Sequence, residues 1–312
     1  MADLHVIIVT YNAMKWAERC FTSLRHSSTP LKCIVVDNGS TDGTQEYVKN
    51  HFPEVDFIQS PENLGFGRAN NIGIEKAYQE GAGFFYLMNQ DAWIYPDSFR
   101  HLLEVYHTHP DNSQIGILSP MHLDGSEKNL DLFFERYLAR NTPMNRIFSH
   151  IFNATLQDYY EIDFVNAAHW LLPRKTIDEI GGFNPYFFHY SEDYEYVQRI
   201  AYYNKKILVS TKSRVVHDGK QTFNKTNHIN AQRVQREQRY LDPALHFDKK
   251  VLNRDFIPKI IKQTLKLQFS DASATFREYL YQKSRFDEII NLRAALKNKG
   301  AAFLHVTREN VI

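Results

Sequence analysis

Three stretches of apolar residues that each end at a polar edge constrain the fold of this chain more than any other feature. They are residues 5–12, 33–40 and 84–91, and two of them carry an aspartate at or near the polar end, Asp37 and Asp91. A buried strand of a parallel sheet has this pattern. Because ligands of open α/β sheets bind beyond the carboxyl ends of the strands, the pattern predicts a site for a nucleotide and a cation at one sheet edge.

Strand and helix patterns alternate from residue 4 to about residue 120, which indicates βαβ units. The predicted fold class is therefore α/β, with a mostly parallel, Rossmann-like central sheet and helices on both of its faces. Helices are predicted at residues 14–27, 44–52, 67–80 and 97–107, and strands, besides the first, at residues 32–37, 55–59 and 84–88.

Residues 120–160 are less regular, because Pro120, Gly125 and Pro143 interrupt the apolar pattern. We predict a variable insertion over this range. Periodicity then returns. A strand is predicted at residues 164–173, helices at 174–180 and 192–203, and another strand at 206–209.

The chain changes character after about residue 245, where two helices are predicted, at residues 256–269 and 275–297. We therefore expect a domain over residues 1–245 and a C-terminal helical extension over residues 246–312. Residues 248–268 carry six basic and two acidic side chains, a net charge of +4, among isoleucines and leucines. Such an amphipathic helix suits peripheral contact with an anionic membrane. Packing on the first domain, or pairing with a second chain as a homodimer, explains the pattern equally well.

Composition excludes some classes of function. The chain has 312 residues, 43% of them hydrophobic and 23% charged, as in an ordinary globular protein. Its formal net charge of +1 gives no support to nucleic-acid binding through bulk charge. Aromatic residues are numerous, with 22 Phe and 18 Tyr, and we assign most of them to core packing.

Three features favour a cytoplasmic protein with at most peripheral membrane contact. Only two cysteines, Cys20 and Cys33, occur in a chain of this length, which is typical of a reducing compartment. The first residues run directly into the first strand without a signal-like apolar region. No stretch reaches the roughly 20 apolar residues that a membrane-spanning helix needs.

Six segments form an ordered set of motifs between residues 4 and 220, at residues 6–12, 35–44, 63–71, 87–91, 181–183 and 191–193. Together they resemble a family-2 glycosyltransferase with the GT-A fold, most closely its rhamnosyltransferase-like subgroup. That resemblance implies an inverting enzyme of bacterial surface polysaccharide synthesis. It would use a UDP- or dTDP-sugar donor, a divalent cation (Mg²⁺ or Mn²⁺) and a hydroxyl of a glycan or lipid-linked acceptor.

The resemblance also implies a donor site. Asp37 would accept a hydrogen bond from the N3–H group of uracil or thymine, although a turn or helix-capping aspartate has the same pattern. Arg68 would pair with the diphosphate, since guanidinium groups bind phosphate in this way. Glycine at position 65 would let the backbone approach the donor. The full set of expected donor contacts is Thr10, Asn12, Asp37, Asn38, Gly65, Arg68, Asn89 and Gln90.

A metal site is implied at Asp91, where the family usually has Asp-x-Asp. Here the motif is Asn89-Gln90-Asp91, so one charge is lost but an oxygen ligand remains. Carboxylate oxygens and substrate phosphates suit both Mg²⁺ and Mn²⁺. His217 would be a second metal ligand or would contact the diphosphate, and a purely structural histidine is the alternative. Lys220 and Gln221 would contact phosphate.

The acceptor side is implied by the segment around Asp193, which we predict to be the general base. A carboxylate at a helix start is favoured in its ionised form by the helix dipole, and inversion needs a base for the acceptor proton. Glu192 would orient the acceptor, and Tyr190 belongs to an aromatic approach on which a sugar can stack. Trp170 would be either an acceptor wall or a core residue. Acidic residues that merely stabilise the helix remain the alternative for Glu192 and Asp193.

Two other classes of function remain as alternatives. A sugar nucleotidyltransferase would need a glycine-rich basic loop after the first strand, and residues 10–13 lack it. A catalytically degenerate nucleotide-binding module is favoured only by Asn89 in place of an aspartate. A processive synthase would need membrane spans and a Gln-x-x-Arg-Trp motif, and residues 235–240 have the wrong spacing.

Overall fold

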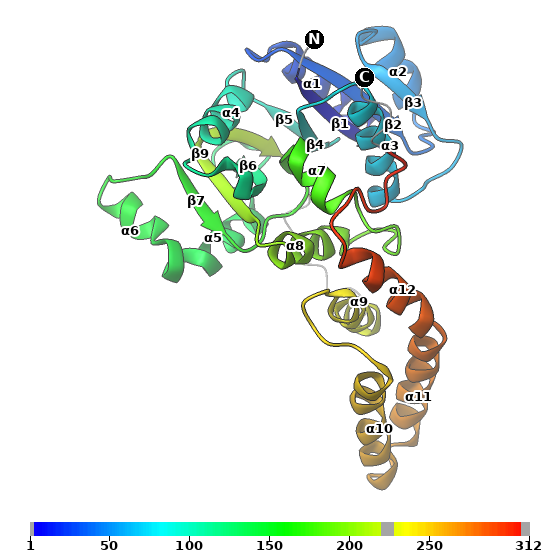
Figure 1. The fold of residues 1–312 in the computed structure, drawn as a ribbon. Coiled ribbons are helices and arrows are strands. Elements are labelled where there is room, and N and C mark those ends of the chain that lie inside the picture. The colour runs from blue at the N-terminus through cyan, green and yellow to red at the C-terminus, as the bar shows by residue number, and fades with distance from the viewer. Residues whose placement is uncertain (1–2, 220–227, 307–312) are drawn as a thin grey trace. The chain divides into compact units, whose positions relative to one another are not determined.

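A nine-stranded sheet is the centre of the fold in a computed structural model that describes residues 3–219 and 228–306 (Figure 1). Its strand order is β3-β2-β1-β4-β8-β6-β9-β5, with β7 paired to β9. The predicted α/β class is confirmed. The strands are β1 (Leu4–Thr10), β2 (Leu31–Asp37), β3 (Asp56–Gln59), β4 (Phe84–Asn89), β5 (Ala92–Ile94), β6 (Ile115–Leu123), β7 (Tyr159–Ile162), β8 (His169–Pro173) and β9 (Lys206–His217).

The part of the sheet that runs from β3 through β2 and β1 to β4 is parallel, and its register brings three polar strand ends together. Thr10 of β1 lies opposite Asp37 of β2, and Val9 of β1 lies opposite Asn89 of β4. Beyond β4 the sheet is mixed, because β8 is antiparallel to both of its neighbours while β6 and β9 are parallel. The expected gathering of strand ends at one edge is confirmed.

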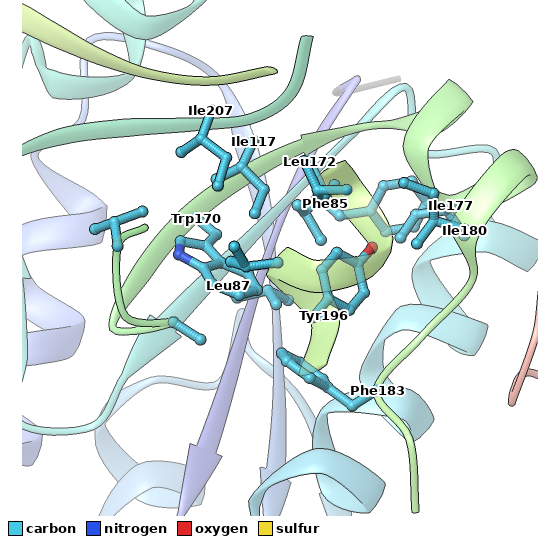
Figure 2. Packing of buried hydrophobic residues seen from close by; sticks show 14 of the residues in the cluster. Phe85, Leu87, Ile117, Trp170, Leu172, Ile177, Ile180, Phe183, Tyr196 and Ile207 are labelled. Carbon is cyan, nitrogen blue, oxygen red and sulfur yellow. The ribbon is translucent and has the colours of Figure 1, made fainter. Parts of the chain in front are cut away.

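Helices cover both faces of the sheet, and each face has its own hydrophobic core. Neighbouring residues of β1 face opposite sides, so Ile7 lies in one core while Val6 and Ile8 lie in the other. The first core, part of which Figure 2 shows, receives side chains from α3, α5, α7 and α8, and the second from α1, α2 and α4. The helices of these two layers are α1 (Met14–Arg25), α2 (Thr44–His51), α3 (Phe66–Gln79), α4 (Ser98–Thr108), α5 (Leu132–Asn145), α6 (Ile147–Phe152), α7 (Arg174–Ile180) and α8 (Glu192–Tyr202).

The structure differs from the sequence expectations in several places. The strand predicted at residues 164–173 begins only at His169, because Phe164 and Val165 are buried in a loop and imitate a strand pattern. The strand predicted to end at residue 209 continues to His217. The irregular range 120–160 contains α5, which begins directly after Asp131, and the short helix α6.

A second compact unit comprises residues 225–299, so the expected boundary at residue 245 falls inside it. Its core includes Tyr240, stacked on Phe247 with ring centroids 4.2 Å apart, and the buried Ile289. Arg293 donates hydrogen bonds to the backbone carbonyls of Tyr240, Asp242 and Leu245 and so joins α12 to the turn after α9. The helices are α9 (His228–Leu241), α10 (Lys249–Leu265), α11 (Phe269–Ser284) and α12 (Phe286–Leu296). Within residues 3–219 and 228–306, no helix has both the length and the apolar character that crossing a bilayer needs.

After the second unit, the chain returns to the first unit through residues 300–306, which we call the C-terminal strap. The backbone N–H of Gly182 donates to the carbonyl of Ala302 at 2.9 Å. The side-chain amide of Asn71 donates to the carbonyls of Phe303 and Phe183. Gly181 has φ +85°, and a Cβ there would lie 2.1 Å from the Ala302 oxygen, so only glycine fits beneath the strap.

Candidate active site

Asp37 is fully buried at the end of β2, and its carboxylate accepts four hydrogen bonds from the protein itself. Oδ2 accepts from the hydroxyls of Thr10 (2.8 Å) and Ser40 (2.6 Å). Oδ1 accepts from the Ser40 backbone N–H (2.9 Å) and the Gln45 side-chain amide (2.8 Å). A carboxylate has about four acceptor positions, so direct contact with a nucleobase requires one of these partners to leave. Thr10 is likewise fully buried and faces Asp37 rather than the solvent.

Asn38 connects the end of β2 to the loop that precedes α3. Its side-chain amide donates to Asn63 Oδ1 (2.9 Å) and to the Gly65 carbonyl (3.2 Å), and its oxygen accepts from the Leu64 N–H (2.8 Å). The side chain is almost completely buried. Asn38 therefore shapes residues 63–65, which we call the α3 loop, instead of presenting its amide to solvent.

The α3 loop lies against residues 183–191, which precede α8 and which we call the α8 loop. The N–H of Phe66 donates to the Phe188 carbonyl at 3.1 Å. Gly65 has φ +83°, and a Cβ there would lie 2.1 Å from that same oxygen, which explains the glycine. Arg68 is exposed and donates to the Pro185 carbonyl at 3.3 Å. The expected donor segment and the expected acceptor segment are therefore in direct contact.

Gln90 and Asn12 fix the loop that follows β1. The Tyr11 N–H donates to Gln90 Oε1 (2.6 Å), and the Gln90 amide donates back to the Tyr11 carbonyl (3.1 Å). Asn12 has φ +53°, and its Oδ1 accepts from the Thr41 N–H at 2.9 Å. Tyr11 and Asn12 are exposed beside this framework. The residues predicted for the donor site thus lie at one edge, and several of them hold its loops in place.

His217, at the end of β9, lies between two carboxylates. Its Nε2 is 3.6 Å from Asp91 Oδ1 and its Nδ1 is 3.2 Å from Asp131 Oδ2. Burial alone would lower the pKa of His217, but the hydrogen bond to Asp131 and the negative charges of Asp91, Asp131 and Asp218 raise it above its usual value. The structure therefore brings the two predicted metal ligands, Asp91 and His217, together.

The residues around this pair fit a hard divalent cation that takes its remaining ligands from substrate phosphates and water. Asp131 occupies Nδ1 of His217, which leaves Nε2 directed toward Asp91, as in histidine ligands oriented by a carboxylate. Asn89 Oδ1 is buried without a hydrogen-bond partner, and the amide nitrogen of Asn89 is 3.4 Å from His217 Nε2. Over the described residues, no group of three or more His, Cys, Asp or Glu side chains forms a metal site. A cation here would have few protein ligands, as Mg²⁺ at phosphate sites commonly does.

Asp193 is half-buried in the first turn of α8, and burial raises its pKa to about 6 against a smaller opposing effect of backbone hydrogen bonds. Its Oδ1 accepts from the Tyr194 N–H at 2.8 Å. The helix dipole was expected to favour the ionised form, yet loss of hydration is the larger effect. A carboxylate with this pKa is ionised at pH 7 and can accept a proton.

Glu192 is almost completely buried, and its Oε2 has no hydrogen-bond partner. Burial, and then the charge of Asp193, raise its pKa to about 8. Its Cβ lies against the start of α3, because a Cβ added at Gly67 would be 3.7 Å from it and 3.0 Å from that of Phe183. The two adjacent carboxyl groups thus differ in protonation at neutral pH, with Glu192 mainly protonated and Asp193 mainly ionised.

The chain reaches these carboxyl groups through two consecutive non-glycine residues in left-handed conformation. Tyr190 has φ +66° and Ser191 has φ +83°, a conformation that costs about 1–3 kcal/mol per residue and clusters at functional sites. The Tyr190 ring is 74% exposed and lies 3.9 Å from the His189 ring, centroid to centroid. Tyr190 thus has an exposed aromatic face on the loop that leads to Asp193, and its role as an acceptor contact stays a prediction.

Trp170 does not form an acceptor wall in this structure. Figure 2 shows it within the core, together with Phe183 and Tyr196, and it is fully buried. Its ring centroid lies 5.9 Å from that of Phe183 and 5.5 Å from that of Tyr196. The correction follows from strand alternation, which turns Trp170 of β8 toward the face that α8 covers.

The sequence prediction missed Asp131, which links two parts of the site. Its Oδ2 contacts His217, while its Oδ1 accepts the N–H groups of Phe133 and Phe134 at 2.9 Å each and caps α5. An aspartate before a helical pattern is a recognisable capping signal, but nothing in the sequence indicates its second partner. Lys220 and Gln221, also predicted to contact phosphate, lie outside the described residues.

The geometry defines an α/β protein in which Asp37, Asp91 and His217 lie at or just past strand ends. Comparison with known proteins then gives the family. The model of glycosyl transferase family 2 matches residues 5–181, more than half of the chain. The chain therefore belongs to this family and is a glycosyltransferase.

Two curated relatives come from bacterial glycan and teichoic acid synthesis. An N-acetylglucosaminyl-diphospho-decaprenol L-rhamnosyltransferase of Mycobacterium tuberculosis is 25% identical over 218 residues, 64% of this chain and 70% of that protein. A teichoic acid poly(glycerol phosphate) polymerase of Staphylococcus epidermidis is 25% identical over 192 residues, 53% of this chain. The match spans only 26% of the polymerase.

A solved structure confirms the GT-A fold. The crystal structure of S. aureus TarS 1–349 in complex with UDP superposes with a TM-score of 0.53, covering 95% of this chain and 90% of that one. Sequence identity is 16%, so the likeness concerns the fold alone.

The double role of Asp131 predicts two separable effects of Asp131→Ala. Loss of the α5 cap should lower the free energy of unfolding by about 1–2 kcal/mol, measured by urea denaturation. Loss of the carboxylate at Nδ1 should also change the tautomer or protonation state of His217, seen in ¹⁵N NMR spectra of the imidazole.

Asp248→Ala is a matched control, because Asp248 caps α10 through the Val251 N–H at 2.8 Å. It should weaken stability by a similar amount and leave the His217 signals unchanged. Unchanged His217 signals in Asp131→Ala would contradict the orienting role.

The buried Glu192 predicts that stability depends on pH. Because its folded pKa, about 8, exceeds the ordinary 4.5, folding favours its protonated form. The free energy of unfolding should therefore fall as pH rises from about 4.5 to about 8. Glu192→Gln removes this loss, so its free energy of unfolding should exceed that of wild type at pH 8, on the order of 2 kcal/mol, with little difference at pH 4.5.

Glu18→Gln, at an exposed position, should show no such pH-dependent gain. An equal gain at both pH values would argue against a buried protonated Glu192.

Proposed function

We propose that the chain transfers a sugar, with inversion, from a UDP- or dTDP-sugar to a hydroxyl of a glycan or lipid-linked acceptor in bacterial surface polysaccharide synthesis. The single observation that carries this proposal is Asp193. Its carboxylate is half-buried, has a pKa of about 6 and lies just past the α8 loop, whose Phe188 carbonyl accepts the Phe66 N–H at the start of α3. A base ionised near neutral pH and close to an expected donor site is what a direct displacement needs.

Three further points support a nucleotide-sugar donor. The chain is a family-2 glycosyltransferase, its fold resembles that of a protein crystallised with UDP, and its curated relatives include an L-rhamnosyltransferase. In the proposal, Asp37 fixes residues 40–45 beneath the base and can accept the base N3–H if Gln45 leaves Oδ1. Arg68 donates to the Pro185 carbonyl of the α8 loop. In the proposal, its guanidinium group leaves this carbonyl and binds an oxygen of the diphosphate.

In the proposed reaction, an acceptor hydroxyl attacks the anomeric carbon from the face opposite the diphosphate. A new C–O bond forms as the bond to the diphosphate breaks, and that electron pair leaves with the nucleoside diphosphate. Asp193 takes the hydroxyl proton. Glu192, mainly protonated, can donate a hydrogen bond to the acceptor but is a poor base at pH 7. Tyr190 offers a surface on which the acceptor sugar can stack.

A divalent cation, Mg²⁺ or Mn²⁺, would neutralise charge that develops on the leaving diphosphate. Asp91 and His217 would hold it, and the Asn89 side-chain amide, whose nitrogen is 3.4 Å from His217 Nε2, lies beside the same position. Asp131 fixes the ring of His217, so that Nε2 rather than Nδ1 is available.

Asp193→Asn is the direct test of the proposed base. Turnover should fall by about 10²–10⁴-fold, the usual contribution of a general base, while the Kd for UDP or dTDP from calorimetry stays within about twofold. In wild type, kcat/KM should fall about tenfold per pH unit below pH 6, since protonated Asp193 cannot accept a proton. Asp287→Asn, at an exposed first-turn position of α12, is the matched control and should leave turnover unchanged. Full turnover in Asp193→Asn would contradict the proposal, because another group would then accept the proton of the acceptor hydroxyl.

Thermal unfolding with UDP, dTDP, GDP and CMP tests the donor and cation sites separately. At about 100 times its Kd, UDP or dTDP should raise the Tm by roughly 5 °C, and Mn²⁺ or Mg²⁺ should increase this shift. Asp91→Asn should retain the nucleotide shift and lose the added effect of the metal. Asp111→Asn, at an exposed site, should retain both. The absence of a shift with any nucleotide would contradict the proposed donor site.

A further inference from the structure

The far end of the α10–α11 hairpin exposes an unusual amount of apolar surface. Leu265, Leu267 and Phe269, around the turn between the two helices, are 79%, 73% and 61% exposed. Ile257 and Ile261 continue the exposed apolar surface along α10, one turn apart on the same face as Leu265. We call Leu265, Leu267 and Phe269 the hairpin tip.

The core of the second unit does not need these side chains. Near its start α10 buries Leu252 and Phe256. α11 is tied by the Glu278 side chain, which accepts from Arg233 and Arg236 of α9. From Ile257 to Ser270, in contrast, almost every residue is exposed. Large contiguous apolar surfaces on a folded unit mark interaction sites, so the tip is expected to contact something outside the chain.

The charges next to the tip indicate a negatively charged contact. Lys259 and Lys262 lie on α10 and Lys266 directly follows it, between or beside the exposed apolar residues in sequence, and no carboxylate among the described residues forms an ion pair with any of them. Asp271 is the only acidic residue between positions 256 and 277. Lysines that flank exposed apolar residues are typical of segments that enter the headgroup region of an anionic bilayer.

We propose that the hairpin tip inserts into the surface of an anionic lipid bilayer, with Lys259, Lys262 and Lys266 on the phosphate groups. A second copy of the chain fits less well, because tip-to-tip contact between two copies would bring the lysines next to each tip close to one another. The tip residues also lie around the turn between α10 and α11. If two copies paired their helices side by side, these residues would stay exposed to solvent. The proposal is independent of the sugar transfer.

Vesicle co-sedimentation of the full chain tests this directly. Wild type should bind phosphatidylcholine vesicles that contain about a third phosphatidylglycerol at least tenfold more tightly than pure phosphatidylcholine vesicles. A variant with Leu265→Ser, Leu267→Ser and Phe269→Ser should lose at least tenfold in affinity for the anionic vesicles. A variant with Lys259→Gln, Lys262→Gln and Lys266→Gln should lose the preference for anionic lipid. Since all six positions are exposed, both variants should fold normally, as circular dichroism can verify.

The chain offers a matched control in the first unit, where Met144 and Phe152 are 88% and 89% exposed. Met144→Ser with Phe152→Ser removes a similar apolar surface and should leave vesicle binding unchanged. Insertion itself can be followed with Leu267→Trp, whose fluorescence should shift to shorter wavelength only with anionic vesicles. All three native tryptophans, Trp16, Trp93 and Trp170, lie outside the hairpin.

Four results would overturn the proposal. Three of them are no preference of wild type for anionic vesicles, unchanged binding by the tip variant, and an equal loss in the Met144 and Phe152 control. A fourth is concentration-dependent self-association, measured by light scattering, that the tip substitutions abolish, because the face would then belong to a second copy. Each of these measurements leaves nucleotide binding untouched, so failure here is distinct from failure of the proposed donor site.

Discussion

The parallel pairing of β1 with a neighbour on each side organises the site. β1 is bonded to β2 and β4 in register and is buried on both faces, so its sequence is apolar from Val6 to Val9. Thr10, Asp37 and Asn89 lie at the carboxyl ends of the three strands, and those ends lie next to one another. The loops that follow then hold one another, as Asn38 does for the α3 loop and Gln90 for the loop after β1.

Four carboxyl groups of this region show how environment separates the uses of one functional group. Asp37 and Asp131 are buried and fully engaged with protein donors, so they fix loops, a helix start and a histidine ring. Glu192 and Asp193 accept too few hydrogen bonds to offset the loss of hydration on burial, so burial raises their pKa values. The raised pKa values bring Glu192 and Asp193 into the neutral pH range, where proton transfer to or from a substrate is reasonable.

Much of the fold and part of the site were predictable from the sequence, for physical reasons that differ from residue to residue. Continuous apolar runs specify buried strands, and polar strand ends specify the edge of the sheet where the site lies. The sequence was therefore sufficient to predict β1, β2, β4 and the position of Asp91. Trp170 was not, because an aromatic residue next to polar ones suits a core and a binding wall equally, and only the packing of α8 decides. The pairing of Asp131 with His217, 86 positions apart, depends on where β9 ends relative to α5, which no local pattern encodes.

Because the C-terminal strap belongs to the first unit, the second unit is an insertion within the sequence of the first. Residues 300–306 lie on the turn that leads into the α8 loop, and Asn71 joins the strap to Phe183. Removing the last part of the chain to study the catalytic unit alone would therefore withdraw a brace from the loop that carries Tyr190 and leads to Asp193. Inactivity of such a shortened protein would report on that loop, and would say nothing about what the helices contribute.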